Sequence, residues 1–341
     1  MEKYRVGIVG ATGMVGQRFI SLLKDHPWFE VNCVAASARS AGKTYREAVG
    51  ERWAFSWEIP EKVAGMTVVD AADIDEVSKH VDFVFCAVDM KKDEIRALEE
   101  AYAKHEIPVV SNNSACRGIE DVPMVVPEIN ADHLAVIEAQ KKRLGTKSGF
   151  IAVKPNCSIQ SYVPALTPLL DFEPEKVSVC TYQAISGAGK TFKTWPEMVD
   201  NVIPYIGGED EKSENEPLKL WGHVEDGKIV NATLPVISAQ CLRVACSDGH
   251  MAAVSVSFKK KPTIEQIKER WANYETEAQR LELPSAPKPF LQYFEDPSRP
   301  QTRLDRDFQN GFGVSIGRLR EDKLFDYRFV CLSHNTVRGA A

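Results

Sequence analysis

Apolar runs and helical patterns alternate through the first half of the chain. Tyr4–Val9 predicts a strand, and the apolar residues from Met14 to Leu23 then fall largely on one side of a helix. Helical spacing returns between 93 and 105. Further strands are predicted at 31–36, 66–69, 81–88, 108–110 and 150–153. Strands separated by helices predict a parallel, doubly wound sheet with ligands at the carboxyl ends of its strands.

The pattern changes after a helix that is predicted to run from Ala131 to about Leu144. The later strands are longer and alternate apolar with polar residues, which is typical of an antiparallel or mixed sheet with one covered face. Thr263 and Gln266 predict a capping box at the start of a helix. The longer strands are predicted at 177–183, 251–258, 311–319 and 324–332.

The length of 341 residues fits about two domains. We predict an α/β protein in which residues 1–131 form a doubly wound parallel Rossmann sheet. The segment 331–341 is predicted to join this domain. Residues 132–330 are predicted to form a second, α+β domain.

A glycine-rich turn separates the first strand from the first helix. Its sequence, Gly10-Ala-Thr-Gly13-Met-Val-Gly16, has the context of a dinucleotide-binding turn, where glycines let the backbone approach a pyrophosphate at the helix N-terminus. The spacing is GxxGxxG rather than GxGxxG, and the alternative is an ordinary tight turn. The predicted cofactor-binding residues here are Gly10, Thr12, Gly13, Met14 and Val15.

The loop after the second strand indicates which cofactor binds. It contains Ser37, Arg39 and Ser40, with Lys43 nearby, and it lacks the acidic residue that usually holds the ribose hydroxyls of NAD. Hydroxyls and cations suit a 2′-phosphate, so we predict NADP. Loop residues of this kind also occur by chance.

Cys157 is the strongest candidate nucleophile. It lies between the strand 150–153 and an apolar run from Ser158 that looks helical, although Pro164 and Pro168 are expected to distort it. The unpaired N–H groups of a helix start would favour the thiolate, and therefore nucleophilic reactivity near neutral pH. The alternative is that Cys157 only fills the core.

Two later residues are candidate partners of this cysteine. His250 is in a Ser-Asp-Gly-His turn, and a histidine near its ordinary pKa could take the thiol proton. Arg243 is predicted on the preceding strand, so both side chains could point into one pocket. A turn histidine bonded to backbone and an arginine in a surface ion pair are the alternatives. With a dinucleotide fold, this set indicates aldehyde or acyl oxidoreduction through a thioester.

Three other stretches are candidates for ligand binding. Arg117 follows the strand 108–110, where it could bind an anion, although a solvated loop arginine is equally consistent. Ser186-Gly-Ala-Gly189-Lys190 is not a phosphate loop, because Ala184 stands where the motif requires glycine. Its glycines more plausibly let the backbone approach nicotinamide or substrate. The acidic stretch 207–214 is expected to be a surface insertion or lid, with a plain solvated loop favoured.

Composition excludes several classes of protein. The net charge of −6 and pI near 5.8 argue against a protein that binds nucleic acid or a membrane surface as a whole. The apolar runs are too short to span a bilayer. Eight scattered cysteines without zinc spacing predict a cytoplasmic, reducing setting and no metal site.

Taken in order, the motifs closely resemble those of the aspartate-β-semialdehyde dehydrogenase family, in its archaeal and fungal-type branch, over nearly the whole chain. This resemblance implies NADPH-dependent reduction of L-aspartyl-4-phosphate to L-aspartate-4-semialdehyde, with release of phosphate, in lysine, methionine and threonine biosynthesis. It also implies that 132–330 is a catalytic and dimerisation domain of a homodimer or homotetramer. The motifs are 10–16, 111–117, 122–127, 155–158, 183–189, 248–250 and 334–339.

The resemblance also implies roles for individual residues. Cys157 would form a thioester with the substrate, His250 would be the acid/base, and the backbone near Asn156 and Cys157 would hold the oxyanion. Arg243 would bind the α-carboxylate and Glu209 the amino group. The remaining roles are phosphate binding by Lys212 and Arg117, orientation of the intermediate by Gln183, and cofactor contacts by Ser186, Gly187, Gly189 and Asn335.

Some alternatives remain open at this point. Malonyl-CoA reductase is a close relative on the same scaffold and N-acetylglutamyl-phosphate reductase a more distant one, while a non-catalytic NADP-binding regulator would keep the fold alone. Ala245 stands where the family often has proline. Because the family normally continues into a further helix, we expect either a shortened chain or a cofactor domain without its last element.

Overall fold

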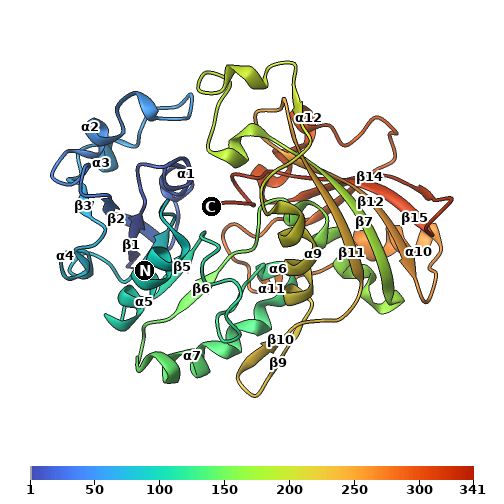
Figure 1. Ribbon diagram of the computed structural model, residues 1–341, viewed down its shortest axis with the longest axis horizontal. Coiled ribbons are helices and arrows are strands. Elements are labelled where there is room, and N and C mark those ends of the chain that lie inside the picture. The colour runs from blue at the N-terminus through green and yellow to red at the C-terminus, as the bar shows by residue number, and fades with distance from the viewer. Residues whose placement is uncertain (1) are drawn as a thin grey trace.

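Two β-sheets organise the chain in this computed structural model, which describes residues 2–341 (Figure 1). The first sheet has the order β3-β2-β1-β4-β5-β6, and all its strands are parallel. This is the predicted doubly wound arrangement, with the order of strands reversing on either side of β1. The strands are β1 (Tyr4–Val9), β2 (Phe29–Ala36), β3 (Val69–Asp70), β4 (Phe83–Cys86), β5 (Val109–Ser111) and β6 (Ile151–Val153).

Helices connect these strands. The two longest are α1 and α5, and α1 buries Phe19, Ile20 and Leu23 against the sheet, as the apolar spacing predicts. The helices of this domain are α1 (Met14–Leu23), α2 (Tyr45–Val49), α3 (Glu61–Ala64), α4 (Ile74–Ser78), α5 (Lys92–Lys104), α6 (Pro127–Asn130) and α7 (Ile137–Leu144), with 3-10 turns η1 (Gly50–Arg52) and η2 (Ala131–Val136).

The structure differs from the predicted elements of this half in several places. The strand predicted at 66–69 is observed as β3, which begins only at Val69. The helix predicted from Ala131 is a 3-10 segment that becomes α-helical only at Ile137. The sheet also takes its last strand, β6, from beyond residue 131. The predicted domain boundary therefore divides this sheet, because the chain crosses to η2 and α7 before it returns to pair with β5.

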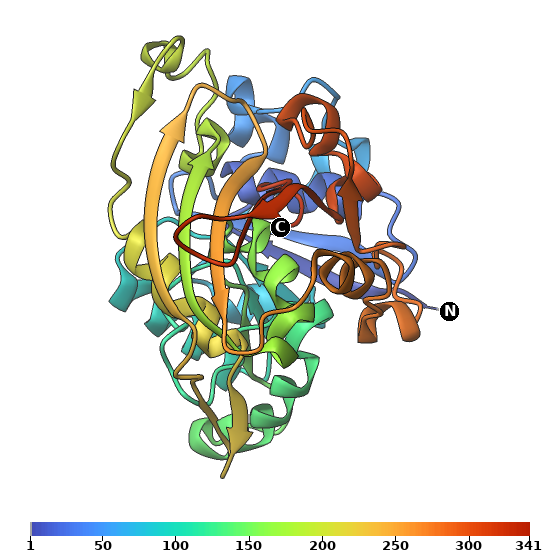
Figure 2. The same cartoon turned by 90° about the vertical axis from the view of Figure 1, so that its right-hand side faces the viewer.

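The second sheet is mixed and has the order β13-β14-β15-β12-β7-β11-β8 (Figure 2). Buried and less buried residues alternate along β12, so one face is covered, as predicted. The strands are β7 (Pro174–Gln183), β8 (Val202–Ile203), β11 (Val236–Val244), β12 (His250–Phe258), β13 (Leu291–Phe294), β14 (Val314–Glu321) and β15 (Tyr327–Ser333), and β9 (His223–Glu225) and β10 (Lys228–Val230) form a separate hairpin.

Short helices cover the inner face of this sheet. Thr263 and Gln266 form the predicted capping box of α10, whose Trp271 is among the largest fully buried side chains. Pro164 and Pro168 break the segment after Cys157 into single turns, as expected. The elements are η3 (Ile159–Ser161), α8 (Val163–Leu166), η4 (Thr167–Phe172), η5 (Ile185–Ala188), η6 (Pro196–Met198), α10 (Ile264–Ala272), α11 (Glu277–Arg280), α12 (Thr302–Asp305) and η7 (Phe308–Gly311).

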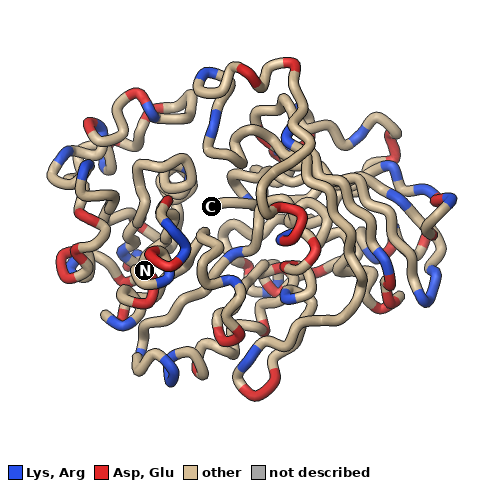
Figure 3. The backbone as a smooth tube through the Cα atoms, in the orientation of Figure 1, with Lys and Arg blue, Asp and Glu red and all other residues tan. Residues whose placement is uncertain are grey.

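The acidic stretch 207–214 is not the surface loop or lid that its composition predicts. It begins α9 (Glu209–Leu220), which packs on β11 and buries Glu209 and Ser213. Three acidic residues occupy the first turn, where the positive end of the helix dipole stabilises them. Elsewhere, charges of both signs are distributed along both domains (Figure 3). Among residues 2–341 we find no helix long and apolar enough to cross a membrane.

The final segment connects the two domains. Cys331 to Ser333 belong to β15 in the second sheet, so only the residues after them return to the first domain. There Thr336 accepts a hydrogen bond of 2.9 Å from Arg18. Arg338 forms two hydrogen bonds of 2.9 Å with the carboxylate of Glu128, and both side chains are nearly fully buried.

Removing one partner of this buried pair should destabilise the protein. We expect Glu128→Gln to lower the free energy of unfolding by about 3–5 kcal/mol, because Arg338 would keep an uncompensated buried charge. Urea denaturation measures the change. Glu138→Gln, which removes an exposed partner of Lys141, is the matched control and should have little effect. Equal effects of the two substitutions would contradict the prediction.

Candidate active site

A cavity of about 290 Å³ lies between the two domains at the carboxyl ends of the parallel strands. The loops after β1, β5 and β6 supply one side, and β7, β11 and α9 supply the other. Cys157 lines this cavity together with all six predicted substrate-binding residues: Arg117, Asn156, Gln183, Glu209, Lys212 and Arg243. Residues separated by more than 120 positions in the sequence, such as Arg117 and Arg243, therefore line one cavity.

Cys157 and His250 form a close pair. The Sγ atom lies 3.4 Å from Nε2 of His250, which is fully buried at the start of β12. The other ring nitrogen, Nδ1, accepts a hydrogen bond of 3.0 Å from the backbone N–H of Ala184. The neutral ring therefore carries its proton on Nε2 and donates it toward the sulfur. In this tautomer Nε2 is a donor, so taking the thiol proton would require a change of tautomer; the acid/base role that the resemblance implies for His250 stays a prediction.

The electrostatic setting of the pair also differs from the prediction. Burial raises the pKa of Cys157, and Glu209 adds to the effect, while Lys154, Arg243 and Arg117 oppose it. The helix start that was expected to favour the thiolate is a single 3-10 turn of three residues. Burial, with Arg243 next in importance, lowers the pKa of His250 well below its ordinary value. The histidine is therefore neutral at physiological pH.

Glycines allow the backbone to enclose the pair. A Cβ atom on Gly187 would lie 2.9 Å from both Nη1 of Arg243 and Nε2 of His250. A Cβ atom on Gly339 would lie 2.8 Å from Cβ of Cys157. At Gly339 a Cβ atom would also lie 2.5 Å from the backbone carbonyl oxygen of Asn335, so this position requires glycine. At Gly187 a Cβ atom would displace the side chains of Arg243 and His250.

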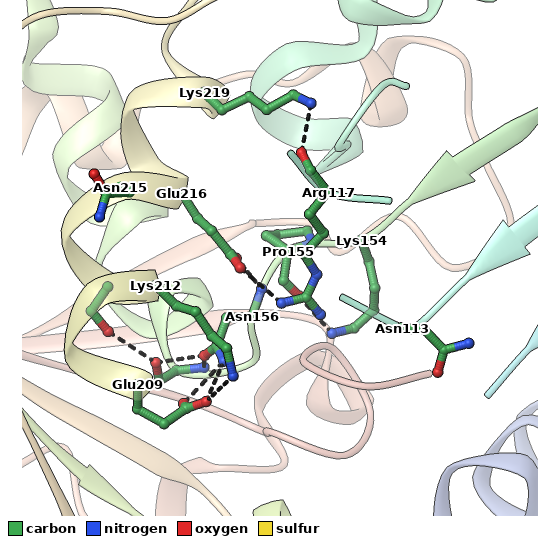
Figure 4. Close-up of polar contacts among 12 residues, drawn as sticks. Asn113, Arg117, Lys154, Pro155, Asn156, Glu209, Lys212, Asn215, Glu216 and Lys219 are labelled. Atoms are coloured by element: carbon green, nitrogen blue, oxygen red, sulfur yellow. Dashed lines mark hydrogen bonds and ion pairs between the residues drawn. The ribbon is translucent and has the colours of Figure 1, made fainter. Parts of the chain in front are cut away.

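Both the backbone N–H and the side-chain amide of Asn156 form hydrogen bonds (Figure 4). Its side-chain amide donates to both carboxylate oxygens of Glu209, at 2.9 and 3.0 Å, and its oxygen accepts from the backbone of Ser158 at 2.7 Å. Its own backbone N–H donates to Glu216 at 2.5 Å. This N–H is therefore engaged by Glu216, and the oxyanion role of the backbone near Asn156 and Cys157 stays a prediction.

Two residues of the site were not anticipated. Glu216 accepts hydrogen bonds from the backbone N–H of Asn156 and, at 2.8 Å, from the guanidinium group of Arg117. It lies two helical turns after Glu209 on α9. Only the helical state of that stretch could have indicated this. Lys154 lines the cavity directly before the Pro-Asn-Cys motif, so its position in the sequence was a usable signal.

A second cavity, of about 700 Å³, adjoins the glycine turn. Gly10 has φ +89°, and a Cβ atom there would lie 2.3 Å from the Ala87 carbonyl, so this position requires glycine. Met14 and Val15 line the first cavity instead, which places the start of α1 between the two spaces. The lining includes the predicted residues Gly10, Thr12, Gly13, Ser37, Arg39 and Ser40, with Lys43, and also Arg52, Asp70 and Asp89, which were not anticipated.

The residues predicted to contact nicotinamide lie in the same cavity as Cys157. Ser186, Gly187, Gly189 and Asn335 all line the first cavity. Asn335 donates a hydrogen bond of 2.9 Å to Ser186 and accepts one of 2.8 Å from the backbone of Gly249. The two cavities could thus hold the two ends of one dinucleotide, with its pyrophosphate at the start of α1.

The raised pKa of Cys157 has a measurable consequence. We expect its alkylation by iodoacetamide to be slow at pH 7 and to accelerate up to and beyond pH 9, because burial disfavours the reactive thiolate. Mass spectrometry of the peptide that contains Cys157 gives the rate at each pH. Buried Cys33 in the same digest is the control for unfolding. A rate that is already maximal at pH 7 would contradict the prediction.

Comparisons with known proteins identify both halves of the chain. Residues 5–137 match the family described as semialdehyde dehydrogenase, NAD binding domain, and residues 166–338 match semialdehyde dehydrogenase, dimerisation domain. The chain is 43% identical to an aspartate-semialdehyde dehydrogenase of Archaeoglobus fulgidus, covering 99% of this chain and 95% of the relative. It is 45% identical to that of Schizosaccharomyces pombe, covering 99% and 94%.

A solved structure agrees with these matches. The aspartate-semialdehyde dehydrogenase of Candida albicans, determined with NADP, superposes with a TM-score of 0.89 at 38% identity and covers 99% of this chain and 95% of that one. The parallel sheet and the mixed sheet therefore correspond to a known pair of domains.

Proposed function

Since this chain belongs to the aspartate-semialdehyde dehydrogenase family, we propose that it reduces L-aspartyl-4-phosphate to L-aspartate-4-semialdehyde with NADPH and releases phosphate. The observation that carries the proposal is the pair of Cys157 and His250, 3.4 Å apart in a cavity rich in cations. This reaction belongs to the biosynthesis of lysine, methionine and threonine.

The charges of the cavity suit this substrate. L-Aspartyl-4-phosphate carries a carboxylate, an ammonium group and a phosphate. Arg243 is placed to bind the carboxylate, and Glu209 can accept the ammonium group. We assign phosphate binding to Arg117 and Lys212. We assign orientation of the acyl group to Gln183, whose Nε2 donates a hydrogen bond of 3.2 Å to Oε2 of Glu209.

Cys157 acts as the nucleophile. Its thiolate attacks the acyl carbon, the bond to the phosphate oxygen breaks, and a thioester forms. NADPH supplies the hydride that reduces this thioester. The resulting oxyanion collapses to the aldehyde, and the sulfur leaves again as thiolate. The thiol proton of Cys157 must leave to water before the attack; after that step no residue has to gain or lose a proton in this sequence.

His250 assists by donating a hydrogen bond. Its Nε2–H points at the sulfur, where it stabilises the thiolate, and it can hold the nearby oxyanion in the same way. The hydrogen bond from Ala184 to Nδ1 keeps the ring in this tautomer. An imidazolium would place an N–H on Nδ1 against that donor, so the arrangement favours the neutral ring.

NADP fits the second cavity. Arg39 and Lys43 line it, and within residues 2–341 neither has a carboxylate within 4.0 Å. Ser37 and Ser40 add two hydroxyls for a 2′-phosphate. The glycine turn leaves the start of α1 open to the pyrophosphate.

The alternatives fit less well. A malonyl thioester has no amino group for Glu209 to accept, whereas the aspartyl substrate has one. A non-catalytic regulator would not require Cys157, His250 and Arg243 to converge on one cavity.

The wider setting also forms part of the proposal. The match to a dimerisation domain supports a homodimer or homotetramer. All eight cysteines, each within the described chain, are free thiols, which supports a reducing, cytoplasmic location.

The first test measures NADP reduction with L-aspartate-4-semialdehyde and phosphate. We expect activity that requires phosphate, and we expect Cys157→Ala to lower kcat by about four orders of magnitude or more, because the thioester cannot form. Cys180→Ala, at a partly exposed thiol on β7, is the matched control and should keep full activity. Malonyl-CoA-dependent oxidation of NADPH, with no turnover of the semialdehyde, would replace the proposal by the reductase alternative.

The second test addresses the cofactor. We expect Arg39→Ala to raise KM for NADP by about tenfold and to leave KM for NAD nearly unchanged, because only NADP carries the 2′-phosphate. Initial rates at varied cofactor concentration give both constants. A parallel rise for both cofactors would show that Arg39 does not recognise this group.

A further inference from the structure

Four cations line the cavity around Cys157, and they differ in their partners. Arg117 pairs with Glu216 at 2.8 Å, and Lys212 pairs with Glu209 at 2.8 Å. For Arg243 and Lys154, no carboxylate of the described chain lies within 4.0 Å. Among residues 2–341, two of the four cavity cations therefore have no carboxylate partner.

Lys154 follows β6 and directs its ammonium group into the cavity. It is partly exposed, and Nζ donates a hydrogen bond of 2.7 Å to the carbonyl of Pro155. An ammonium group has three donors, so two remain for a ligand. Figure 4 shows its Nζ beside the guanidinium of Arg117. Neighbouring like charges repel each other unless an anion lies between them.

The surroundings of Lys154 destabilise the charged form of its side chain. Burial lowers its pKa to about 7, and Arg117 contributes to this effect, while Cys157, Glu216 and Glu209 partly oppose it. An anion beside Nζ would restore the stability of the charged form. The cavity is thus arranged to gain free energy when a negative group reaches this position.

The substrate brings two anionic groups to the two unpaired cations. Arg243 donates to the carbonyl of Ala184 at 2.7 Å on the His250 side of the cavity, and it takes the α-carboxylate in the proposed function. Lys154, in the loop after β6, lies beside Arg117, which is already assigned to the phosphate. We propose that Lys154 is a phosphate-binding residue that acts with Arg117 on the leaving group. This inference rests on the proposed function.

Glu216 also affects how strongly each cation of the cavity attracts phosphate. It pairs with Arg117 at 2.8 Å, so the arginine alone is a weakened anion ligand. Lys154 has no carboxylate within 4.0 Å among residues 2–341. Most of the selective attraction for phosphate should therefore come from the lysine, which directly precedes the Pro-Asn-Cys motif.

Phosphate kinetics test this assignment. In the semialdehyde-oxidising assay, we expect Lys154→Met to raise KM for phosphate about 10- to 100-fold, which is the loss of one charge-assisted hydrogen bond. KM values for NADP and for semialdehyde should change less than about threefold. Lys154→Arg should recover most of the loss. Lys142→Met, at an exposed lysine of α7, is the matched control.

The pH profile provides an independent readout. Because the lysine is charged below its lowered pKa of about 7, the KM ratio of Lys154→Met to wild type should be largest near pH 6 and should decline toward pH 9. Ionisation of phosphate cancels in this ratio. Arg117, Cys157, Glu209 and Glu216 face the ammonium group in both proteins, so their titration largely cancels as well.

The outcomes separate this inference from the proposed function. A wild-type protein without phosphate-dependent activity would refute the proposed function itself. An active wild type with an unchanged KM for phosphate in Lys154→Met would overturn the lysine assignment alone, as would a rise confined to KM for NADP. If the methionine variant does not fold, Lys154→Gln takes its place with the same expected values.

Discussion

Two carboxylates of α9 hold the loop that carries the reactive cysteine. Glu209 binds the side chain of Asn156 and Glu216 binds its backbone, so the residue before Cys157 is fixed from both ends. Each carboxylate also pairs with a cation of the cavity. One helix thereby fixes the residue before Cys157 and also pairs with two of the cavity cations.

This arrangement explains why so many ionisable groups can be buried at one place. A buried charge without a partner costs several kcal/mol, whereas a hydrogen-bonded pair costs far less. In the described chain, Arg117 and Lys212 have carboxylate partners, and in our proposal Lys154 and Arg243 are the cations that bind the anionic groups of the ligand. His250 is neutral, so it adds no further positive charge beside Arg243 that would need a partner.

The sequence was sufficient to predict the alternating first domain, the mixed second sheet and many of the residues that meet at the cavity, although not Lys154 or Glu216. Glycine spacing and apolar periodicity are local signals, and β1 and α1 occur at the predicted residues. The helical state of 209–220 was missed because its stability comes from packing on β11 and from charge pairing. Burial of Cys157 likewise depends on segments such as Gly339, which are remote in sequence. A thiol pKa therefore could not be inferred from the strand-to-helix turn alone.

Burial of Cys157 also bears on oxidative damage. Peroxide attacks thiolates much faster than thiols, so a cysteine that stays protonated in the empty cavity resists conversion to sulfenic acid. Anions bound to Lys154, Arg243 and Arg117 would neutralise the charges that oppose the raised pKa, so they would not increase the share of thiolate. The protein should therefore lose activity to oxidants slowly, and an idle pool of it would keep its nucleophile intact.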